Sequence, residues 1–287
     1  MEGEKPREAH YPVGWKDALY AKLLNLDDNI YLLVDGVHNE SFYPKLKSAN
    51  CFRYLPLYSS APSADEETLG LGPVLVQHNT AHRKQWDTLV ELTNGLPALS
   101  VIISPESIEE LAQRLIPWCV VDADGYTLAL SFADTRILPV LVNTLDDEQR
   151  KQFVGPALKW LYPGRDAAWL FLPVDPLHAL PPSGGITLTT LQVAALTAAS
   201  EADSIRYHLS QYVSKPMSFY SPFEAHSVIS KWLGLADQLR MEASPDRLAL
   251  CEFAVIRPGL EEDARYLALL ESAPSAVNFE EVRQLLS

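Results

Sequence analysis

The stretch LSVIISPESIEELAQRL, residues 99–115, contains the alternation that decides the fold. Its first part, LSVII at 99–103, is apolar and rich in β-branched residues, which is typical of a buried strand. The sequence Ser107-Ile108-Glu109-Glu110 then has the capping-box pattern. In that pattern the serine hydroxyl accepts from first-turn N–H groups while the glutamate returns to the cap. The stretch therefore predicts a strand followed directly by a capped helix.

Runs of the same two kinds fill the first 172 residues. The strand-like ones are rich in Val, Ile, Tyr and Phe and are bounded by Gly, Pro or Asp. Asp124-Gly125 separates two of them and predicts a tight hairpin, because this dipeptide tolerates positive φ. We expect strands at 30–37, 51–58, 74–78, 99–103, 118–121, 126–132 and 168–172, and helices at 16–26, 82–96, 107–115 and 146–153. These elements predict an α/β lobe over residues 1–172, a sheet with helices packed on it.

A proline- and glycine-rich segment follows, and after it the pattern becomes helical. The sequence LPVDPLHALPPSGG at 172–185 cannot continue a helix or a central strand, so residues 173–185 are predicted to be a linker. Beyond it, apolar residues recur at steps of three and four. We therefore predict an all-α lobe at 186–287, with helices at 188–212, from 221, at 244–257, at 261–271 and at 278–286.

Composition excludes several classes of protein. The chain has 287 residues and a formal net charge of −14, from 37 acidic and 23 basic residues. This excess of acid argues against a nucleic-acid partner, because phosphate binding needs clustered Lys and Arg. No apolar run reaches the ~18–20 residues of a membrane helix, and the charged N-terminus lacks the apolar core of a secretory signal. Together with an odd number of cysteines, three, these features predict a cytoplasmic protein without membrane insertion or disulfides.

A search for catalytic motifs gives only weak signals. There is no Gly-x-Ser-x-Gly elbow, no phosphate loop and no His-Glu-x-x-His. The Gly-Leu-Gly-Pro sequence at 70–73 lacks a third glycine, and its proline removes an N–H that a phosphate site needs. His78 and His82 are four residues apart, but they sit at a strand end and a helix start without a third ligand nearby. We therefore expect no catalytic residues, no metal site and no cofactor.

Asp134 and Arg136 are the most informative charged residues. They follow the strand predicted at 126–132, at the start of a helical stretch. An aspartate there is expected to cap the helix, and loss of such a cap costs about 1 kcal/mol. Arg136 could pair with a carboxylate, that of Asp134 being one candidate. Pro139 leaves two alternatives: a helix that begins at Asp134 and is kinked, or one that begins near Pro139 itself.

Aromatic residues cluster late in the sequence. Most such clusters belong to a core, but aromatics also dominate the anchor points of protein interfaces. The candidate partner-binding residues are Tyr207, Tyr212, Phe219, Tyr220, Phe223 and Trp232.

Several motifs together resemble one bacterial family of unknown function, DUF4123. Its pattern is Ser-Pro-Leu, a Glu-Glu-Leu helix, a strand hairpin, Phe-Tyr-Asp-Pro-Arg and a later Gly-Pro before an aromatic segment. The present chain has SPESIEEL from residue 104, the hairpin VVDADGYTLAL, then Phe132, Asp134 and Arg136 of the charged motif, and later VGPALKWLY. YLLVDG at 31–36 resembles the family's opening strand. Ala133 and Thr135 replace the usual Tyr and Pro.

The resemblance implies a function in protein secretion. Members of the family are effector adaptors, or chaperones, of the type VI secretion system in Gram-negative bacteria. They bind a cognate secreted toxin and help place it on the valine-glycine-repeat spike protein, without enzymatic activity or a cofactor. Two alternatives stay open: an immunity-type protein that neutralises a toxin by binding it, and an enzyme with a dispersed site.

Overall fold

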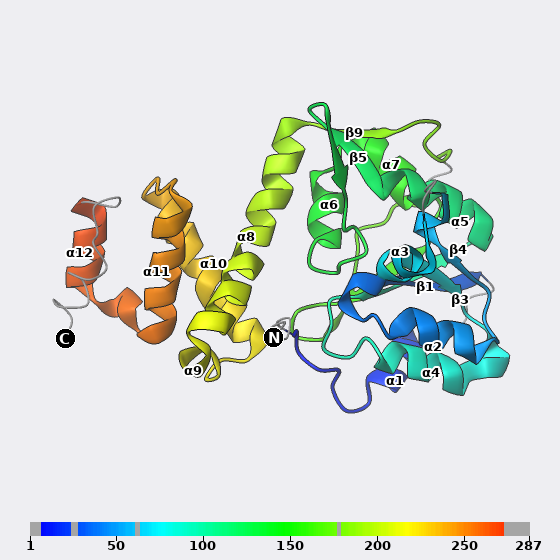
Figure 1. The fold of residues 1–287 in the computed structure, drawn as a ribbon, viewed down its shortest axis with the longest axis horizontal. Coiled ribbons are helices and arrows are strands. Elements are labelled where there is room, and N and C mark those ends of the chain that lie inside the picture. The colour runs from blue at the N-terminus through cyan, green and yellow to red at the C-terminus, as the bar shows by residue number, and fades with distance from the viewer. Residues whose placement is uncertain (1–6, 24–27, 61–63, 177–178, 273–287) are drawn as a thin grey trace. The chain divides into compact units, whose positions relative to one another are not determined.

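The computed structural model describes residues 7–23, 28–60, 64–176 and 179–272 (Figure 1). The chain separates into two compact units. Residues 8–199 form the sheet unit, and residues 1–7 with 200–287 form the helical unit. The predicted fold class, an α/β portion followed by an all-α portion, is confirmed.

The main sheet of the sheet unit has six strands in the order β2-β3-β1-β4-β7-β8. Every pair whose register is defined is antiparallel. The strands are β1 (Asn29–Asp35), β2 (Tyr54–Pro56), β3 (Pro73–Gln77), β4 (Leu99–Ser104), β7 (Lys159–Pro163) and β8 (Trp169–Phe171). Strand β7 was not predicted. It pairs with β4, with Trp160 opposite Ile102. The indole Nε1–H of Trp160 donates to Ser100 Oγ at 2.9 Å.

Both faces of this sheet are covered, which explains why residues 30–34 of β1 form an unbroken apolar run. Successive side chains of a strand point to opposite faces. Tyr31 and Leu33 therefore enter one core and Leu32 and Val34 enter another, and all four are fully buried. Figure 1 shows α1, α2 and α4 on one side of the sheet and α5, α6 and α7 on the other.

Helices α5 and α7 of the sheet unit begin at capping boxes. Ser107 and Glu110 form the predicted capping box of α5, and Asp146 and Gln149 form another at α7. The helices are α1 (Trp15–Leu23), α2 (Phe42–Ala49), α3 (Glu66–Leu71), α4 (Arg83–Glu91), α5 (Ile108–Leu115), α6 (Leu138–Thr144) and α7 (Asp147–Val154).

A second sheet has the order β6-β5-β9 and includes the predicted hairpin. β5 (Val120–Ala123) and β6 (Tyr126–Ala129) are joined by Asp124 and Gly125, both at positive φ, +54° and +79°. β9 (Ile186–Leu188) pairs parallel with β5. Residues 186–199 belong to the sheet unit, whereas the sequence placed them in the helical lobe. The strand at 186–188 is too short to give a periodic signal, and residues 190–199 are the first part of the long helix α8.

The helical unit is built around its own apolar core. Trp232, Leu250 and Tyr266, from three different helices, are among the buried residues of that core. The helices are α8 (Thr190–Tyr212), which begins in the sheet unit, α9 (Ser214–Met217), α10 (Pro222–Gln238), α11 (Ser244–Ile256) and α12 (Ala264–Ser272). The capping box expected at Ser221 and Glu224 is present at α10. The helix predicted at 278–286 lies outside the described residues.

Candidate functional site

Phe132, Asp134 and Arg136 lie on the loop between β6 and α6. Phe132 is fully buried, and its ring meets that of Phe153 edge to face, with centroids 5.6 Å apart. Asp134 is 4% exposed, and the side chain of Arg136 is 19% exposed. The motif therefore has an apolar anchor at one end and a nearly buried ion pair at the other.

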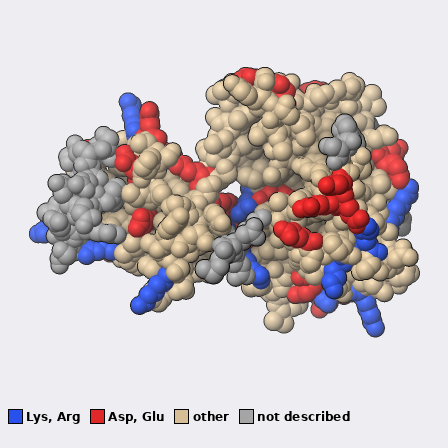
Figure 2. All heavy atoms as spheres, in the orientation of Figure 1, with Lys and Arg blue, Asp and Glu red and all other residues tan. Residues whose placement is uncertain are grey.

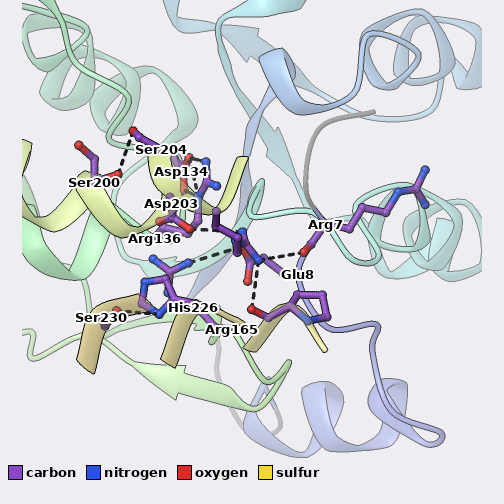
Figure 3. Close-up of polar contacts among 12 residues, drawn as sticks. Arg7, Glu8, Asp134, Arg136, Arg165, Ser200, Asp203, Ser204, His226 and Ser230 are labelled. Carbon is purple, nitrogen blue, oxygen red and sulfur yellow. Dashed lines mark hydrogen bonds and ion pairs between the residues drawn. The ribbon is translucent and has the colours of Figure 1, made fainter. Parts of the chain in front are cut away.

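The ion pair is bidentate (Figure 3). Arg136 Nε donates to Asp134 Oδ1 at 3.0 Å, and Arg136 Nη2 donates to Oδ2 at 2.6 Å. The backbone N–H of Arg136 also donates to Oδ1, at 2.8 Å, which closes a turn around the aspartate. This geometry fixes both the loop and the guanidinium in one orientation.

Asp134 does not cap helix α6, which corrects the sequence interpretation. The helix begins at Leu138 with Pro139 in its first turn, and its N-cap, Ile137, makes no side-chain hydrogen bond. Of the two alternatives left open, the start near Pro139 is therefore confirmed. The carboxylate is used by Arg136 instead, two residues along the chain.

Two residues that sequence analysis missed complete the cluster. His38 Nε2 lies 3.1 Å from Asp134 Oδ2 and 4.0 Å from Asp35 Oδ2. Asp35 ends β1 and accepts the N–H of Val37. The contact between His38 and Asp134 could not be predicted from the sequence, because the two residues are 96 positions apart. We call Asp35, His38, Asp134 and Arg136 the Asp134 cluster.

The two carboxyl groups of the cluster titrate differently. Burial raises the pKa of Asp134, but the hydrogen bonds from His38 and Arg136 outweigh it, so its pKa lies well below the usual range. Burial raises the pKa of Asp35 to about 6, with His38 opposing the rise and Asp134 adding to it. Asp134 is thus held as a carboxylate, whereas Asp35 changes charge just below neutral pH.

Close backbone packing holds the cluster in place. Thr135 N–H donates to Pro97 O at 2.9 Å, and Asp35 N–H donates to Ala98 O at 2.8 Å. A Cβ on Gly36 would lie 1.9 Å from Gly70 O, so only glycine fits there. The carbonyl oxygens of Gly70 and Gly72 therefore lie directly against Gly36.

The cavity beside the cluster is small. A cavity lined by Thr135, Arg136 and Arg165 has a volume of about 10 Å³. Such a volume accommodates one water molecule at most. The cluster is therefore suited to anchoring the loop, with its charged groups already engaged by one another.

A second buried charged group, Arg114 on α5, connects three segments. Its Nη2 donates to Glu106 Oε1 at 2.6 Å and to Ala179 O at 2.9 Å, and its Nη1 donates to Gln152 O at 3.0 Å. The residue is 2% exposed. Gly155 lies so close that a Cβ there would be 2.3 Å from Arg114 Nε. Sequence analysis missed this network, since an arginine in the last turn of an amphipathic helix is usually exposed.

The six candidate aromatic residues divide between surface and core. Trp232 is 2% exposed and belongs to the core of the helical unit, and Tyr220 packs against that core. The other four are exposed, by between 42% and 78% of their surface. We call them the exposed aromatic set: Tyr207, Tyr212, Phe219 and Phe223.

The histidines considered as metal ligands are engaged in ring contacts. The ring of His78 packs edge to face on Trp86, with ring centroids 4.4 Å apart. The ring centroids of His82 and Phe52 are 6.3 Å apart. Among the described residues, no three His, Cys, Asp or Glu side chains are grouped so that they could hold a metal ion. Within the same ranges, no helix combines the length and apolar character required to cross a bilayer.

Comparison with known proteins identifies one family. No curated protein and no solved structure matches the chain significantly. A family model described as "Domain of unknown function (DUF4123)" matches residues 30–152. The matched segment runs from β1 to α7 and includes every residue of the Asp134 cluster. The resemblance to the DUF4123 family that the sequence indicated is therefore confirmed over residues 30–152.

Proposed function

We propose that this protein is a non-enzymatic adaptor that binds a cognate secreted toxin of a type VI secretion system and helps load it onto the valine-glycine-repeat spike. In this proposal it acts in the cytoplasm of a Gram-negative bacterium, before export. The match to the DUF4123 model over residues 30–152 supports the proposal, because the resemblance to this family implies such a role.

The observation that carries the proposal is the exposed aromatic set. Phe219 is 78% exposed, Tyr212 75% and Phe223 47%. These residues lie on α8, on α10 or between them. Large aromatic side chains are enriched at the energetic centres of protein interfaces, where each loses much apolar surface to water on binding.

In this proposal the exposed aromatic set covers apolar segments of the toxin. An exposed apolar helix aggregates in water, and laying its apolar face against aromatic side chains removes that face from solvent. A specific interface of standard size would bury about 800 Å² on each partner. The net charge of −14 favours solubility of the adaptor before it binds the toxin.

Co-expression with the toxin encoded beside this gene tests the proposal. The variant combines Tyr212→Ser, Phe219→Ser and Phe223→Ser. The control combines Val13→Ser and Leu180→Ser, two apolar residues of the sheet unit that are even more exposed. We expect the triple variant to remain folded and to lose recovery of soluble toxin, while the control retains it.

Full recovery of soluble toxin with the triple variant would contradict the assignment of the helical unit as the binding surface. Cell survival separates the adaptor from the immunity-type alternative. An immunity protein rescues cells in which the toxin acts, whereas an adaptor does not rescue them and is instead required for secretion.

A further inference from the structure

The four sheet edges of the sheet unit are protected to very different degrees. Unpaired edge strands invite pairing with other chains, and proteins usually block them with proline, with lysine or with covering groups. β2 ends in Pro56, and the edge residue Phe171 of β8 lies under Lys22 Nζ, 4.9 Å from its ring centroid. On β9, Thr187 O accepts from Gln149 Nε2. Three edges therefore carry a recognisable block.

The fourth edge, β6, carries none of these. All four of its residues are exposed, and none is lysine or proline. In the described part of the chain β6 pairs with β5 alone. The pairing is regular, with Val121 opposite Leu128 and Ala123 opposite Tyr126, so no bulge interrupts it.

The register identifies the backbone groups that face outward. Leu130 N–H donates to Cys119 O, toward β5. Because N–H and C=O groups alternate in direction along an antiparallel strand, those of Leu128 and Tyr126 also face β5. The N–H and C=O groups of Thr127 and Ala129 therefore point away from the sheet and can pair with an added strand.

Side chains define the chemistry of the strand that this edge would accept. Tyr126 is 78% exposed and Leu128 39%, and they share the sheet face of the buried Val121. An added strand with apolar side chains on that face would extend the apolar surface.

The charge around the hairpin indicates which charge the added strand would carry. The hairpin carries Asp122 and Asp124, and residues 115–135 contain no Lys or Arg. Where Figure 1 draws the hairpin, the surface in Figure 2 shows acidic atoms and no basic ones. A second copy of this acidic chain would bring like charges together, whereas a basic segment would be attracted.

We propose that β6 is a docking edge that binds an extended segment of a partner protein by strand addition, and that this segment alternates apolar with basic residues. Backbone hydrogen bonds to Thr127 and Ala129 supply affinity, and the side chains supply selectivity. The inference rests on the proposed function only for the identity of the protein that carries the segment.

The test titrates the full-length chain with three blocked hexapeptides and follows backbone amides by NMR. The probe alternates lysine and valine, one control is N-methylated on alternate amides, and the other replaces lysine with glutamate. We expect saturable shifts at the Thr127 and Ala129 amides with the probe alone. In the chain, Tyr126→Lys should abolish these shifts, and the matched Val13→Lys change, at another exposed apolar site, should leave them intact.

Three results would overturn the inference. The first is an absence of saturable shifts at these amides with millimolar probe, and the second is an equal response to the N-methylated peptide. The third is concentration-dependent shifts of the same amides without peptide, which would assign the edge to a second copy. Because no toxin is present, this experiment can fail while toxin recovery in co-expression still supports the adaptor.

Discussion

Replacing Asp134 with alanine should destabilise the fold far more than loss of a helix cap would. The carboxylate accepts three side-chain hydrogen bonds from Arg136, at 2.6, 3.0 and 3.2 Å, and the backbone N–H of Arg136 at 2.8 Å. It also lies 3.1 Å from His38 Nε2. Removing one partner of a buried ion pair costs about 3–5 kcal/mol. Because the side chain of Arg136 is 19% exposed and can regain some hydration, we expect the lower end, about 3 kcal/mol.

Urea unfolding of the Asp134→Ala variant measures this loss directly, with the slope compared to that of the parent to confirm an unchanged mode of unfolding. Asp134→Asn is the matched control, since it keeps the shape and one acceptor oxygen while removing the charge. We expect it to fall between the parent and the alanine variant. A loss of about 1 kcal/mol or less for Asp134→Ala would refute the reasoning, because that is the effect of an ordinary cap.

Three further changes test other parts of the structure. Gly155→Ala should destabilise by about 3 kcal/mol or more, measured by urea unfolding, since its Cβ would meet Arg114 Nε at 2.3 Å and break a buried ion pair; an unchanged midpoint would contradict the packing. The folded pKa of Asp35 is raised from 3.8 to about 6, so between these pH values the native state holds the proton more tightly. As pH rises from about 4 to 6, the parent should therefore lose up to ~3 kcal/mol of unfolding free energy relative to Asp35→Asn, and parallel pH profiles would oppose this. Trp232→Ala should cost about 3–5 kcal/mol of thermal stability as a core truncation, whereas Phe219→Ser should change it by less than about 0.5 kcal/mol as a surface change; the reverse order would misplace both residues.

Local signals in the sequence were sufficient for several elements. The capping boxes at Ser107 and Ser221 predicted the starts of α5 and α10, because the interactions that form them span three residues. Asp124-Gly125 predicted its hairpin for the same reason, since the two residues themselves adopt the positive φ that the turn needs.

Features that depend on distant partners were not predictable. β7 has a burial pattern without strict alternation, and its pairing with β4 joins residues about sixty positions apart. β9 is three residues long and is defined only by its pairing with β5. The outcome for Asp134 has the same cause only in part: His38 is 96 residues away, whereas Arg136, which also binds the carboxylate, is two residues along the chain.

The candidate site was likewise only partly predictable. The sequence located the aromatic residues, yet burial alone separates Trp232 in the core from Phe219 on the surface. Both residues belong to the same aromatic cluster in the sequence, although Trp232 lies in helix α10 and Phe219 lies between α9 and α10. Exposure therefore had to come from the three-dimensional structure.

Secretion of a toxin encoded beside this gene tests the central proposal, that this protein acts by binding and delivering another protein. The measurement is the amount of toxin released into the medium by a strain lacking this gene, complemented with the parent chain or with the Tyr212→Ser, Phe219→Ser, Phe223→Ser variant. We expect release to be lost in the deletion strain, restored by the parent and not restored by the variant. Normal release from the deletion strain would contradict the account.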